Sequence, residues 1–326
     1  MLALIWEALQ SVLVVLIIIL LGFVLQRFHV VSLKFNGDIA KIITYIGLPT
    51  VIFYSLLTNV SHKALISLFE KAVVPGIGTL LTYVIAELCG RLPFLKTGQR
   101  GVFVNSFVNT NTTFIGLAIN NILFGKAGLA SFLVFFLINN LSVWGIGFYL
   151  FEPTQRQIKP HFSLKALLEN IFFKSPPLVA FIVGFVVLSF NWPMPLFVMD
   201  ATQILGSVVT PLSLLYLGIM LYNGGLLKSL RLDIGKILAL VGRFVIEPLI
   251  MFLTIGVASH FFPHLISSTD SQVWLVQSAM PAIAILPILA SQKGSDYRLG
   301  TDIVILSTVL FMPVLPLIFI IARLLY

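Results

Sequence analysis

The stretch SAMPAIAILPILAS, which runs from Ser278 to Ser291, is apolar yet contains two prolines, Pro281 and Pro287. A proline inside a helix removes a backbone N–H donor and clashes with the carbonyl group one turn back. In the hydrocarbon core of a bilayer, only other protein groups or trapped water can satisfy the backbone groups that such a break leaves free. The stretch therefore predicts a membrane-crossing segment whose helix is interrupted inside the protein rather than against lipid.

The composition around this stretch is that of a polytopic membrane protein. Of the 326 residues, 59% are hydrophobic and 10% are charged, and the mean hydropathy is +1.06, whereas soluble globular chains carry about 25% charged residues. The net charge of +8 resides in short loops between apolar runs, which argues against a nucleic-acid partner and leaves the lipid bilayer as the expected surrounding. With a single cysteine, Cys89, and no Cys/His cluster, we expect no disulfide, metal or other cofactor.

The hydropathy pattern predicts an all-α integral membrane protein with ten transmembrane helices. A span needs about 20 mainly apolar residues, and ten stretches qualify: 4–26, 39–59, 70–89, 101–122, 127–151, 171–190, 197–222, 236–262, 271–292 and 299–324. The fourth and the ninth carry more polar and helix-breaking residues than an ordinary lipid-facing span.

The distribution of Lys and Arg predicts how these spans are oriented. Fifteen of the 20 Lys and Arg residues lie in or beside one alternate set of loops, and only four lie in the opposite set. Cytoplasmic loops carry such an excess. We therefore expect a protein of the cell membrane with both termini extracellular and the 152–170 loop cytoplasmic.

Matching residues at fixed offsets indicate an internal repeat. An offset of 162 residues pairs Gly22-Phe23-Val24 with Gly184-Phe185-Val186, and Pro49 with Pro211. An offset of 172 pairs Asn109 with Pro281. We therefore divide the chain into a first five-helix repeat (1–151), a linker (152–170) and a second five-helix repeat (171–326). Because each repeat has an odd number of spans, the two must be inverted relative to each other, as in secondary transporters whose interrupted helices meet at the midplane.

The fourth span, VFVNSFVNTNTTFIGLAINN (102–121), holds an Asn/Thr run at mid-depth. Short polar side chains compete for backbone hydrogen bonds and favour an unwound turn, although they also join helices in many bundles. The N-termini exposed by a break suit a carboxylate, and the freed carbonyl groups suit a cation or proton. The candidate anion-binding residues are Asn109, Thr110, Asn111, Thr112, Thr113 and Pro281, and the weaker candidates for ion coupling are Asn105, Ser106, Gln277 and Ser278.

Other polar residues inside the spans have two readings. Arg243 and Glu247 are four residues apart, so they share a helix face and are expected to pair. Arg243 either supplies a counter-charge to the anion, as intramembrane charges commonly do, or reaches the nearby cytoplasmic surface with its long side chain. For Asn139 and Asn140 in the fifth span, bonding between helices and contact with substrate remain equally open.

Several stretches resemble the auxin efflux carrier family, which includes bacterial malate permease-like proteins and plant auxin transporters. The segment from Ala279 to Leu317 is similar to the last two spans of that family in its Ala-Met-Pro (279–281), the Gly-x-Asp turn at Gly294, and its Leu-Ser-Thr (306–308) and Leu-Pro-Leu (315–317). TPLSLLYLGIML (210–221), GRFVIEPL (242–249) and NTTFIGLAINNILFGKAGLA (111–130) are similar to its seventh, eighth and fourth spans. The resemblance covers nearly the whole chain.

The resemblance implies transport of organic anions by an elevator-like movement of one domain against another. It assigns spans 1, 2, 6 and 7 to a scaffold and spans 3–5 and 8–10 to the moving domain, with broken helices 4 and 9 crossing at the substrate. Asn109, Asn111, Thr113 and Pro281 match the crossover of the family, and Asn139 and Asn140 lie where its fifth span contributes an amide. Two positions depart from the bacterial relatives, many of which have Asn-x-Gly-Phe followed by Gly-x-Pro. Thr113 stands in place of the glycine of the first motif and Ala118 in place of the proline of the second, so malate is not implied as the substrate.

Three other functions remain in competition with an organic-anion carrier that works by efflux or exchange. A sodium-coupled importer of the bile-acid symporter type would need sodium for uptake, so H⁺ and Na⁺ are both open as coupling ions. A passive channel would give fluxes that do not saturate. An enzyme is not expected, because the midplane contains no His, Cys or paired carboxylates of the kind that catalysis uses. The oligomeric state is also open, with a homodimer among the assemblies considered.

Overall fold

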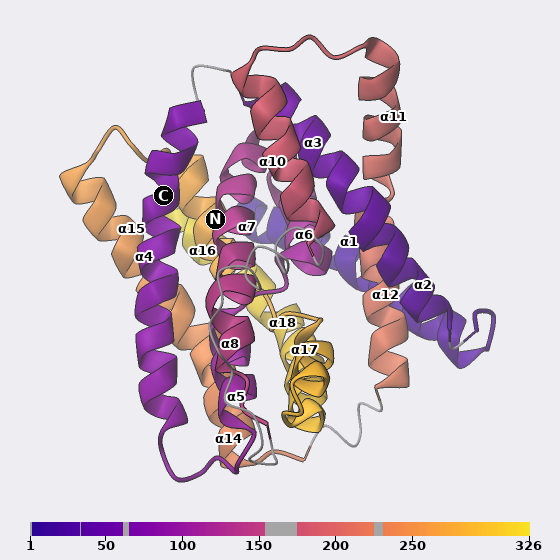
Figure 1. Ribbon diagram of the computed structural model, residues 1–326, viewed down its shortest axis with the longest axis vertical. Coiled ribbons are helices and arrows are strands. Elements are labelled where there is room, and N and C mark those ends of the chain that lie inside the picture. Colours follow the sequence, from indigo (N-terminus) through magenta and orange to yellow (C-terminus); the bar gives the residue numbers. More distant parts are fainter. Residues whose placement is uncertain (1, 33, 61–64, 154–174, 225–230) are drawn as a thin grey trace.

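The computed structural model describes residues 2–32, 34–60, 65–153, 175–224 and 231–326 (Figure 1). These residues are helical throughout, apart from turns and one isolated β-bridge, and they contain no strand. The predicted all-α class is therefore confirmed. Of the predicted 152–170 linker, all but the first two residues lie outside the described part of the chain.

The first half of the chain contains short helices that join end to end into longer rods. In chain order they are α1 (Leu2–Arg27), α2 (Phe35–Ile42), η1 (Ile43–Gly47), α3 (Leu48–Asn59), α4 (Leu65–Gly90), α5 (Arg100–Val108), η3 (Thr112–Gly116), α6 (Leu117–Leu123), η4 (Gly125–Gly128), α7 (Leu129–Ser142), η5 (Val143–Gly147) and α8 (Phe148–Leu150).

The second half has the same character. Its elements are α10 (Pro176–Ser189), α11 (Leu196–Ser207), α12 (Val209–Asn223), α14 (Ile234–Val241), η6 (Gly242–Ile246), α15 (Glu247–Phe261), α16 (Ser268–Ser278), α17 (Leu286–Gln292) and α18 (Tyr297–Leu325). Across the described residues, six helical rods are long and apolar enough to cross a membrane: Phe35–Asn59, Ser67–Gly90, Gly125–Leu150, Leu196–Asn223, Ile234–Phe261 and Tyr297–Leu325.

Local sequence signals explain where several of these helices begin. Asp233 caps α14 by accepting a hydrogen bond from the N–H of Lys236 at 2.9 Å. Ser267 and Asp270 form a reciprocal capping box at the start of α16, which satisfies N–H groups that a helix terminus leaves free. Asp296 caps α18 by accepting hydrogen bonds from the N–H groups of Arg298 and Leu299, both at 3.1 Å. These acidic residues therefore fix the entry of three of the rods.

Within the residues that the structure describes, four rods contain a π-helical turn, namely η1, η3, η5 and η6. A π-helical turn inserts an extra residue into an α-helix and frequently occurs at functional sites. Three of the four, η3, η5 and η6, adjoin the polar centre of the molecule described below.

One group of helices lies to the right in Figure 1, where α1 packs along α12, and α3 packs with α10 and α11. The approach of α1 to α12 is close because both carry glycine at the contact. A Cβ atom at Gly218 would overlap the carbonyl oxygen of Ile19, and one at Gly22 would overlap that of Leu215. Small residues permit such approach of membrane helices, and the resulting van der Waals contact holds them together.

The remaining helices form a second group, in which α4 packs with α5, α7 and α15, and α18 packs with α16 and α17. Polar side chains tie this group together at its ends. Lys71 of α4 pairs with Asp270 of α16 at 2.6 Å, and Lys236 of α14 pairs with Asp302 of α18 at the same distance. Arg100 of α5 pairs with Glu87 of α4.

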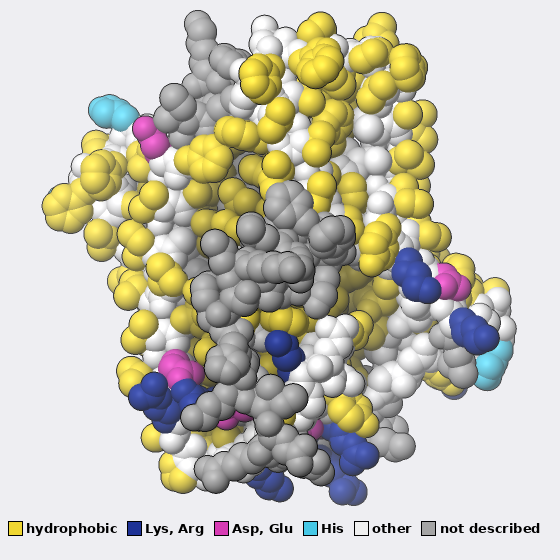
Figure 2. All heavy atoms as spheres, in the orientation of Figure 1, with side chains coloured by type: hydrophobic (Ala, Val, Ile, Leu, Met, Phe, Trp, Pro, Cys, Tyr) yellow, Lys and Arg dark blue, Asp and Glu magenta, His cyan; other side chains and the backbone are white. Residues whose placement is uncertain are grey.

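The surface separates apolar from charged regions. Hydrophobic side chains cover the upper part of the face in Figure 2, while Lys and Arg side chains gather in its lower half. A hydrophobic surface of this extent is suited to lipid rather than to water.

Candidate functional site

The first interruption lies between α5 and η3. Helix α5 ends at Val108, and Asn109 has extended backbone angles (φ −89°, ψ 118°). Helical structure resumes at Thr112, where the side-chain oxygen of Asn111 accepts a hydrogen bond from the N–H of Phe114 at 3.1 Å. The Asn/Thr run thus opens the helix and caps the next one, as its composition predicts.

The second interruption lies between α16, which ends at Ser278, and α17, which begins at Leu286. The two interrupted segments pair as a single antiparallel bridge between Thr110 and Ala282. The N–H of Asn111 donates to the carbonyl of Pro281 at 2.8 Å, and the N–H of Ile283 donates to the carbonyl of Asn109 at 2.9 Å. Each break therefore supplies partners for backbone groups that the other leaves free. We call these paired segments, Asn109–Asn111 and Ala279–Ile285, the crossover.

The side-chain amide of Asn139, on α7, forms hydrogen bonds with the backbone of the crossover. Its side-chain oxygen accepts from the N–H of Thr110 at 3.0 Å, and its amide nitrogen donates to the carbonyl of the same residue at 2.9 Å. The amide nitrogen also donates to the hydroxyl of Thr112 at 3.0 Å. Asn139 thus acts as a bridge between helices in this structure, one of the two readings left open by the sequence.

A buried polar network surrounds the side chain of Asn109. Its amide nitrogen donates to the side-chain oxygen of Asn105 at 2.7 Å and to the hydroxyl of Tyr83 at 3.0 Å. The hydroxyl of Ser142 donates to its side-chain oxygen at 2.6 Å. Asn105 in turn donates to the carbonyl of Gly147 at 2.9 Å. These contacts join α4, α5, α7 and η5 around the first interruption.

Tyr83 and Ser142 do not figure among the residues singled out from the sequence. The sequence shows only that each of these two residues places a hydroxyl group in an apolar span. A hydroxyl group alone does not indicate which distant residue it contacts, so the network becomes visible only when α4 packs against α7.

The candidate cation ligands are dispersed rather than gathered on one point. The hydroxyl of Ser106 donates back to the carbonyl of Phe103 at 2.7 Å, on its own helix. The amide nitrogen of Gln277 donates to the carbonyl of Gly116 at 2.9 Å, and the hydroxyl of Ser278 donates to the carbonyl of Leu275 at 2.8 Å.

Arg243 lies beside the crossover and is fully buried, with an exposed fraction of 0%. It therefore does not reach the surface of the protein. One terminal nitrogen, Nη2, donates to the carbonyl of Ser278 at the end of α16, at 2.8 Å, and the guanidinium forms an ion pair with Glu247. A cation suits that position because the C-terminal end of a helix carries partial negative charge.

Two candidates lie apart from these contacts. The amide nitrogen of Asn140 donates to the carbonyl of Phe136 at 2.9 Å, and its side-chain oxygen accepts from the hydroxyl of Ser175 at 3.5 Å. Asn140 thus points towards the start of α10, whereas its neighbour Asn139 binds the crossover. Thr113 lies in η3 and is half-buried.

The crossover is closed to solvent. Asn109, Thr110, Asn111 and Thr112 each have an exposed fraction of 0%. The side-chain nitrogen of Asn111 and the side-chain oxygen of Gln277 are buried and make no hydrogen bond. Unpaired buried polar groups are costly and rare, so they mark this region as one that can take a polar ligand.

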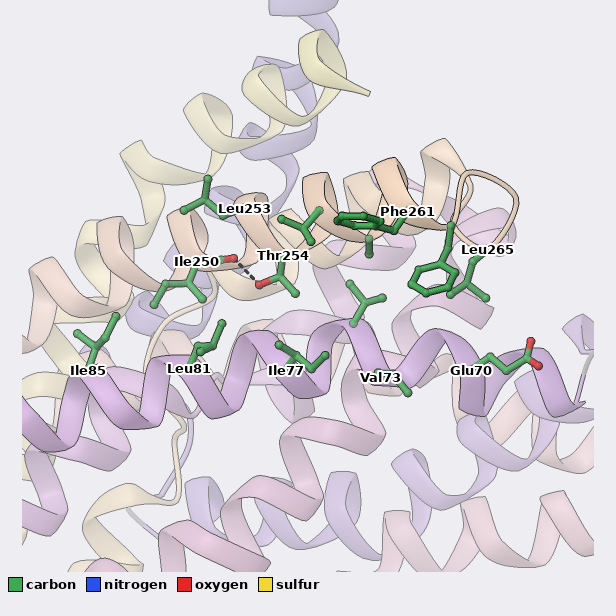
Figure 3. Close-up of a pocket in the computed structure, with 14 residues that line it drawn as sticks. Glu70, Val73, Ile77, Leu81, Ile85, Ile250, Leu253, Thr254, Phe261 and Leu265 are labelled. Atoms are coloured by element: carbon green, nitrogen blue, oxygen red, sulfur yellow. Dashed lines mark hydrogen bonds between the residues drawn. The ribbon is translucent and has the colours of Figure 1, made fainter.

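A separate groove of about 780 Å³ lies between α4 and α15. Figure 3 shows Ile77 and Leu81 of α4 facing Ile250 of α15 across it. Its lining is apolar apart from Thr254 and Glu70. The groove therefore offers no set of groups that would recognise an anion, and the polar crossover remains the candidate site.

Comparison with known proteins identifies the family of this chain. A family model described as membrane transport protein matches residues 7–319. The chain belongs to this family of membrane transport proteins. This is the auxin efflux carrier family that the sequence resembles, so the chain is a multi-pass membrane protein and a transporter.

Curated relatives of the family match over nearly their whole length. An uncharacterized transporter of Methanocaldococcus jannaschii is 25% identical over 311 residues, which cover 94% of this chain and 96% of the relative. An uncharacterized transporter of Methanothermobacter thermautotrophicus is 25% identical over 316 residues, with the same coverage. The family match and both relatives agree on transport.

Proposed function

We propose that the protein is a secondary transporter that carries small organic anions, such as carboxylates, by efflux or exchange. The observation that carries this proposal is the crossover, in which two interrupted helices from opposite halves of the chain pair through their backbones. Helical segments begin at Thr112 and at Leu286, so two N-terminal ends with partial positive charge adjoin the crossover. Such ends suit a carboxylate.

The proposed architecture is that of ten spans in two inverted five-helix repeats, with residues 100–123 and 268–292 as the broken crossing helices. Two observations support it. The interruptions at Asn109 and Pro281 are 172 residues apart, the offset at which the sequence of the two halves matches. The junction between α11 and α12 falls at Val208, 162 residues after Ile46 in the π-helical turn η1, so spans 2 and 7 are distorted at equivalent points.

The proposed mechanism is an elevator in which spans 3–5 and 8–10 move against a scaffold of spans 1, 2, 6 and 7. The distribution of polar contacts supports it. The ion pairs Lys71–Asp270, Lys236–Asp302 and Arg100–Glu87 all join helices of the proposed moving domain. Between the two groups the described polar contacts are single hydrogen bonds, Asn121 to Thr210 at 3.2 Å and Ser175 to Asn140 at 3.5 Å, beside the stacked rings of Phe114 and Tyr216.

The proposed orientation places the lower end of the molecule in Figure 2, where Lys and Arg gather, on the cytoplasmic side of the cell membrane. Both termini then lie outside the cell, and the 152–170 loop lies in the cytoplasm. The excess of Lys and Arg in alternate loops supports this orientation.

Uptake of radiolabelled acetate, lactate, succinate and malate into proteoliposomes, with and without sodium, tests the proposal. We expect saturable uptake of at least one acid, and its loss in Asn111→Ala, which removes both the cap on η3 and the unpaired amide nitrogen. Asn59→Ala at the end of α3 serves as the matched control, because Asn59 bonds only within its own turn in the described contacts. Folded protein that moves none of the four acids would refute the proposal.

Two results of the same assay would favour the alternatives. Uptake that requires sodium indicates a sodium-coupled importer. Uptake that does not saturate indicates a passive channel. In either case the Asn111→Ala variant still tests whether the solute passes the crossover.

A further inference from the structure

We propose that Glu247 is the proton-coupling residue of this transporter and that it competes with the substrate carboxylate for Arg243. The proposal rests on the proposed function and names the ion that accompanies the anion. Proton symport follows if Glu247 takes up a proton whenever an anion replaces it on the guanidinium.

The first observation is the burial of the pair. The side chains of Arg243 and Glu247 have exposed fractions of 0% and 2%. Arg243 and Glu247 lie about two and a half and three and a half turns into the rod that begins at Ile234, since a helix has about 3.6 residues per turn. Charges at such depth are expensive and usually functional. Removing one partner leaves the other as an uncompensated buried charge.

The second observation is the position of the pair against both halves of the crossover. Nη2 of Arg243 donates to the carbonyl of Ser278, three residues before Pro281. Gly242, the preceding residue, lies so close to α5 that a Cβ atom there would overlap the ring of Phe107. The π-helical turn η6 thus brings the guanidinium to the point where the two broken helices meet.

The third observation is the unused donor capacity of Arg243. Nε and Nη1 are buried and make no hydrogen bond. A guanidinium offers five N–H donors in a planar fork that matches a carboxylate. The side-chain nitrogen of Asn111, in the crossover, is a further buried donor with no hydrogen bond. A bound carboxylate would accept hydrogen bonds from these unpaired N–H groups.

These observations determine how charge must balance. When an anion binds to Arg243, two carboxylates would share one guanidinium in a site closed to water, and like charges so placed cannot both stay ionised. Glu247 therefore accepts a proton from solution and becomes a neutral carboxylic acid, while the anion takes its place on Arg243. When the anion leaves, Glu247 releases the proton and pairs with Arg243 again. Anion and proton then travel in the same direction.

Charged and titratable side chains on the elements packed against this pair have other neighbours in the described structure. These are Lys236 of α14, paired with Asp302; Arg100 of α5, paired with Glu87 and Glu152; Asp270 of α16, paired with Lys71; Tyr83 of α4, bonded to Asn109 and Ser142; and Glu70 of α4, which lines the α4–α15 groove. Glu247 is thus the carboxylate placed to exchange with a substrate on Arg243.

The test uses proteoliposomes that contain a trapped pH-sensitive dye and the acid that the wild type carries from the panel above. We expect about one proton to enter with each anion in the wild type, and its apparent affinity to weaken about tenfold per pH unit at high pH, the slope for one linked proton. Glu247→Gln should retain anion–anion counterflow at equal pH, lose proton movement and show no pH dependence. Its amide keeps the size of the side chain and leaves the Arg243–Ser278 bond possible.

Glu87→Gln is the matched control, because Glu87 also pairs with arginine but lies on the surface end of α4, and it should behave as the wild type. The inference is overturned if Glu247→Gln moves protons with the wild-type pH profile. It is also overturned if folded Glu247→Gln loses counterflow altogether, since Glu247 would then be needed for binding itself. A wild type that carries none of the acids refutes the proposed function first, which separates the two failures.

A second measurement needs no variant. Purified wild type in detergent and weak buffer should take up about one proton for each acid molecule it binds. Binding without proton uptake overturns the inference even if the Glu247→Gln protein fails to fold.

Discussion

Asn139 shows how one side chain can replace a missing stretch of backbone. Its amide meets both the N–H and the carbonyl of Thr110, which in an uninterrupted helix would bond to residues one turn away. Inside a membrane protein these groups cannot turn to water. The break in the fourth span therefore depends on a residue from the fifth.

The Asn139→Ala variant should be less stable than the wild type and should not transport. Loss of the amide leaves two buried backbone groups of Thr110 unpaired, at a cost of about 1–3 kcal/mol each. Thermal unfolding in detergent and acid uptake into proteoliposomes measure the two effects. Asn140→Ala is the matched control, because that neighbour bonds to Phe136 and Ser175 instead. Equal effects of the two substitutions would contradict the role assigned to Asn139.

At this scale the sequence indicates the kind of residue but not its partner. The Asn/Thr run from Asn109 to Thr113 and the proline at Pro281 fall at or beside the stretches between α5 and η3 and between α16 and α17. The sequence does not distinguish Asn139 from Asn140. Adjacent residues on a helix point about 100° apart, and only the packing of the helices decides which of the two contacts the crossover. Arg243 is undecided for the same reason, since its depth along the helix does not reveal that protein surrounds it.

The helices of this protein are less regular than their hydropathy suggests. Apolar runs predict where the rods lie, and in the structure Asp233 and Asp296 cap the starts of two of them. The π-helical turns η3, η5 and η6 have no comparable signal, because an extra residue in a turn leaves the apolar composition unchanged. They arise where tertiary contacts, such as that of Gly147 with Asn105, hold the backbone in place.

Gly218→Ala should weaken the contact between α1 and α12 and lower the thermal unfolding temperature. The added Cβ would overlap the backbone of Ile19, and overpacking of this kind costs about 1–3 kcal/mol. Gly256→Ala on α15 is the matched control, because a Cβ there meets no atom within 4 Å and alanine favours a helix by up to about 1 kcal/mol. A drop in unfolding temperature for Gly256→Ala, or none for Gly218→Ala, would show that the two rods are not held by close approach.

The molecule as a whole contains one group of helices bound by close apolar contact and another bound by buried polar networks and ion pairs. Sequence reasoning reaches the division into these groups only through the family resemblance, because composition does not tell which rods are neighbours. The contact of Phe114 with Tyr216 lies between the groups, with ring centroids 4.8 Å apart. That of Phe23 of α1 with Tyr222 of α12 lies within the first group, at 5.3 Å.

These two aromatic pairs allow a test of the proposed movement of one group of helices against the other. On a Cys89→Ser background, the double substitution Phe114→Cys/Tyr216→Cys should lose transport when a short, reducible bifunctional thiol reagent links the two positions, and regain it on reduction. The linked Phe23→Cys/Tyr222→Cys protein should transport as before, because both positions would lie on the same rigid body. Each variant without reagent supplies its own baseline. Full transport by the linked Phe114/Tyr216 protein would exclude an elevator movement.

The buried state of Asn109–Thr112 also has an electrical consequence. A continuous chain of water molecules along polar groups in the middle of the membrane would let small ions cross. Such a leak would discharge the electrical potential across the membrane. Here the polar groups of the crossover bond to one another and to neighbouring side chains such as Asn139, and none is exposed to solvent, so we expect no continuous path for small ions through this region. A cell can therefore keep many copies of this carrier in its membrane without short-circuiting the gradients on which other carriers depend.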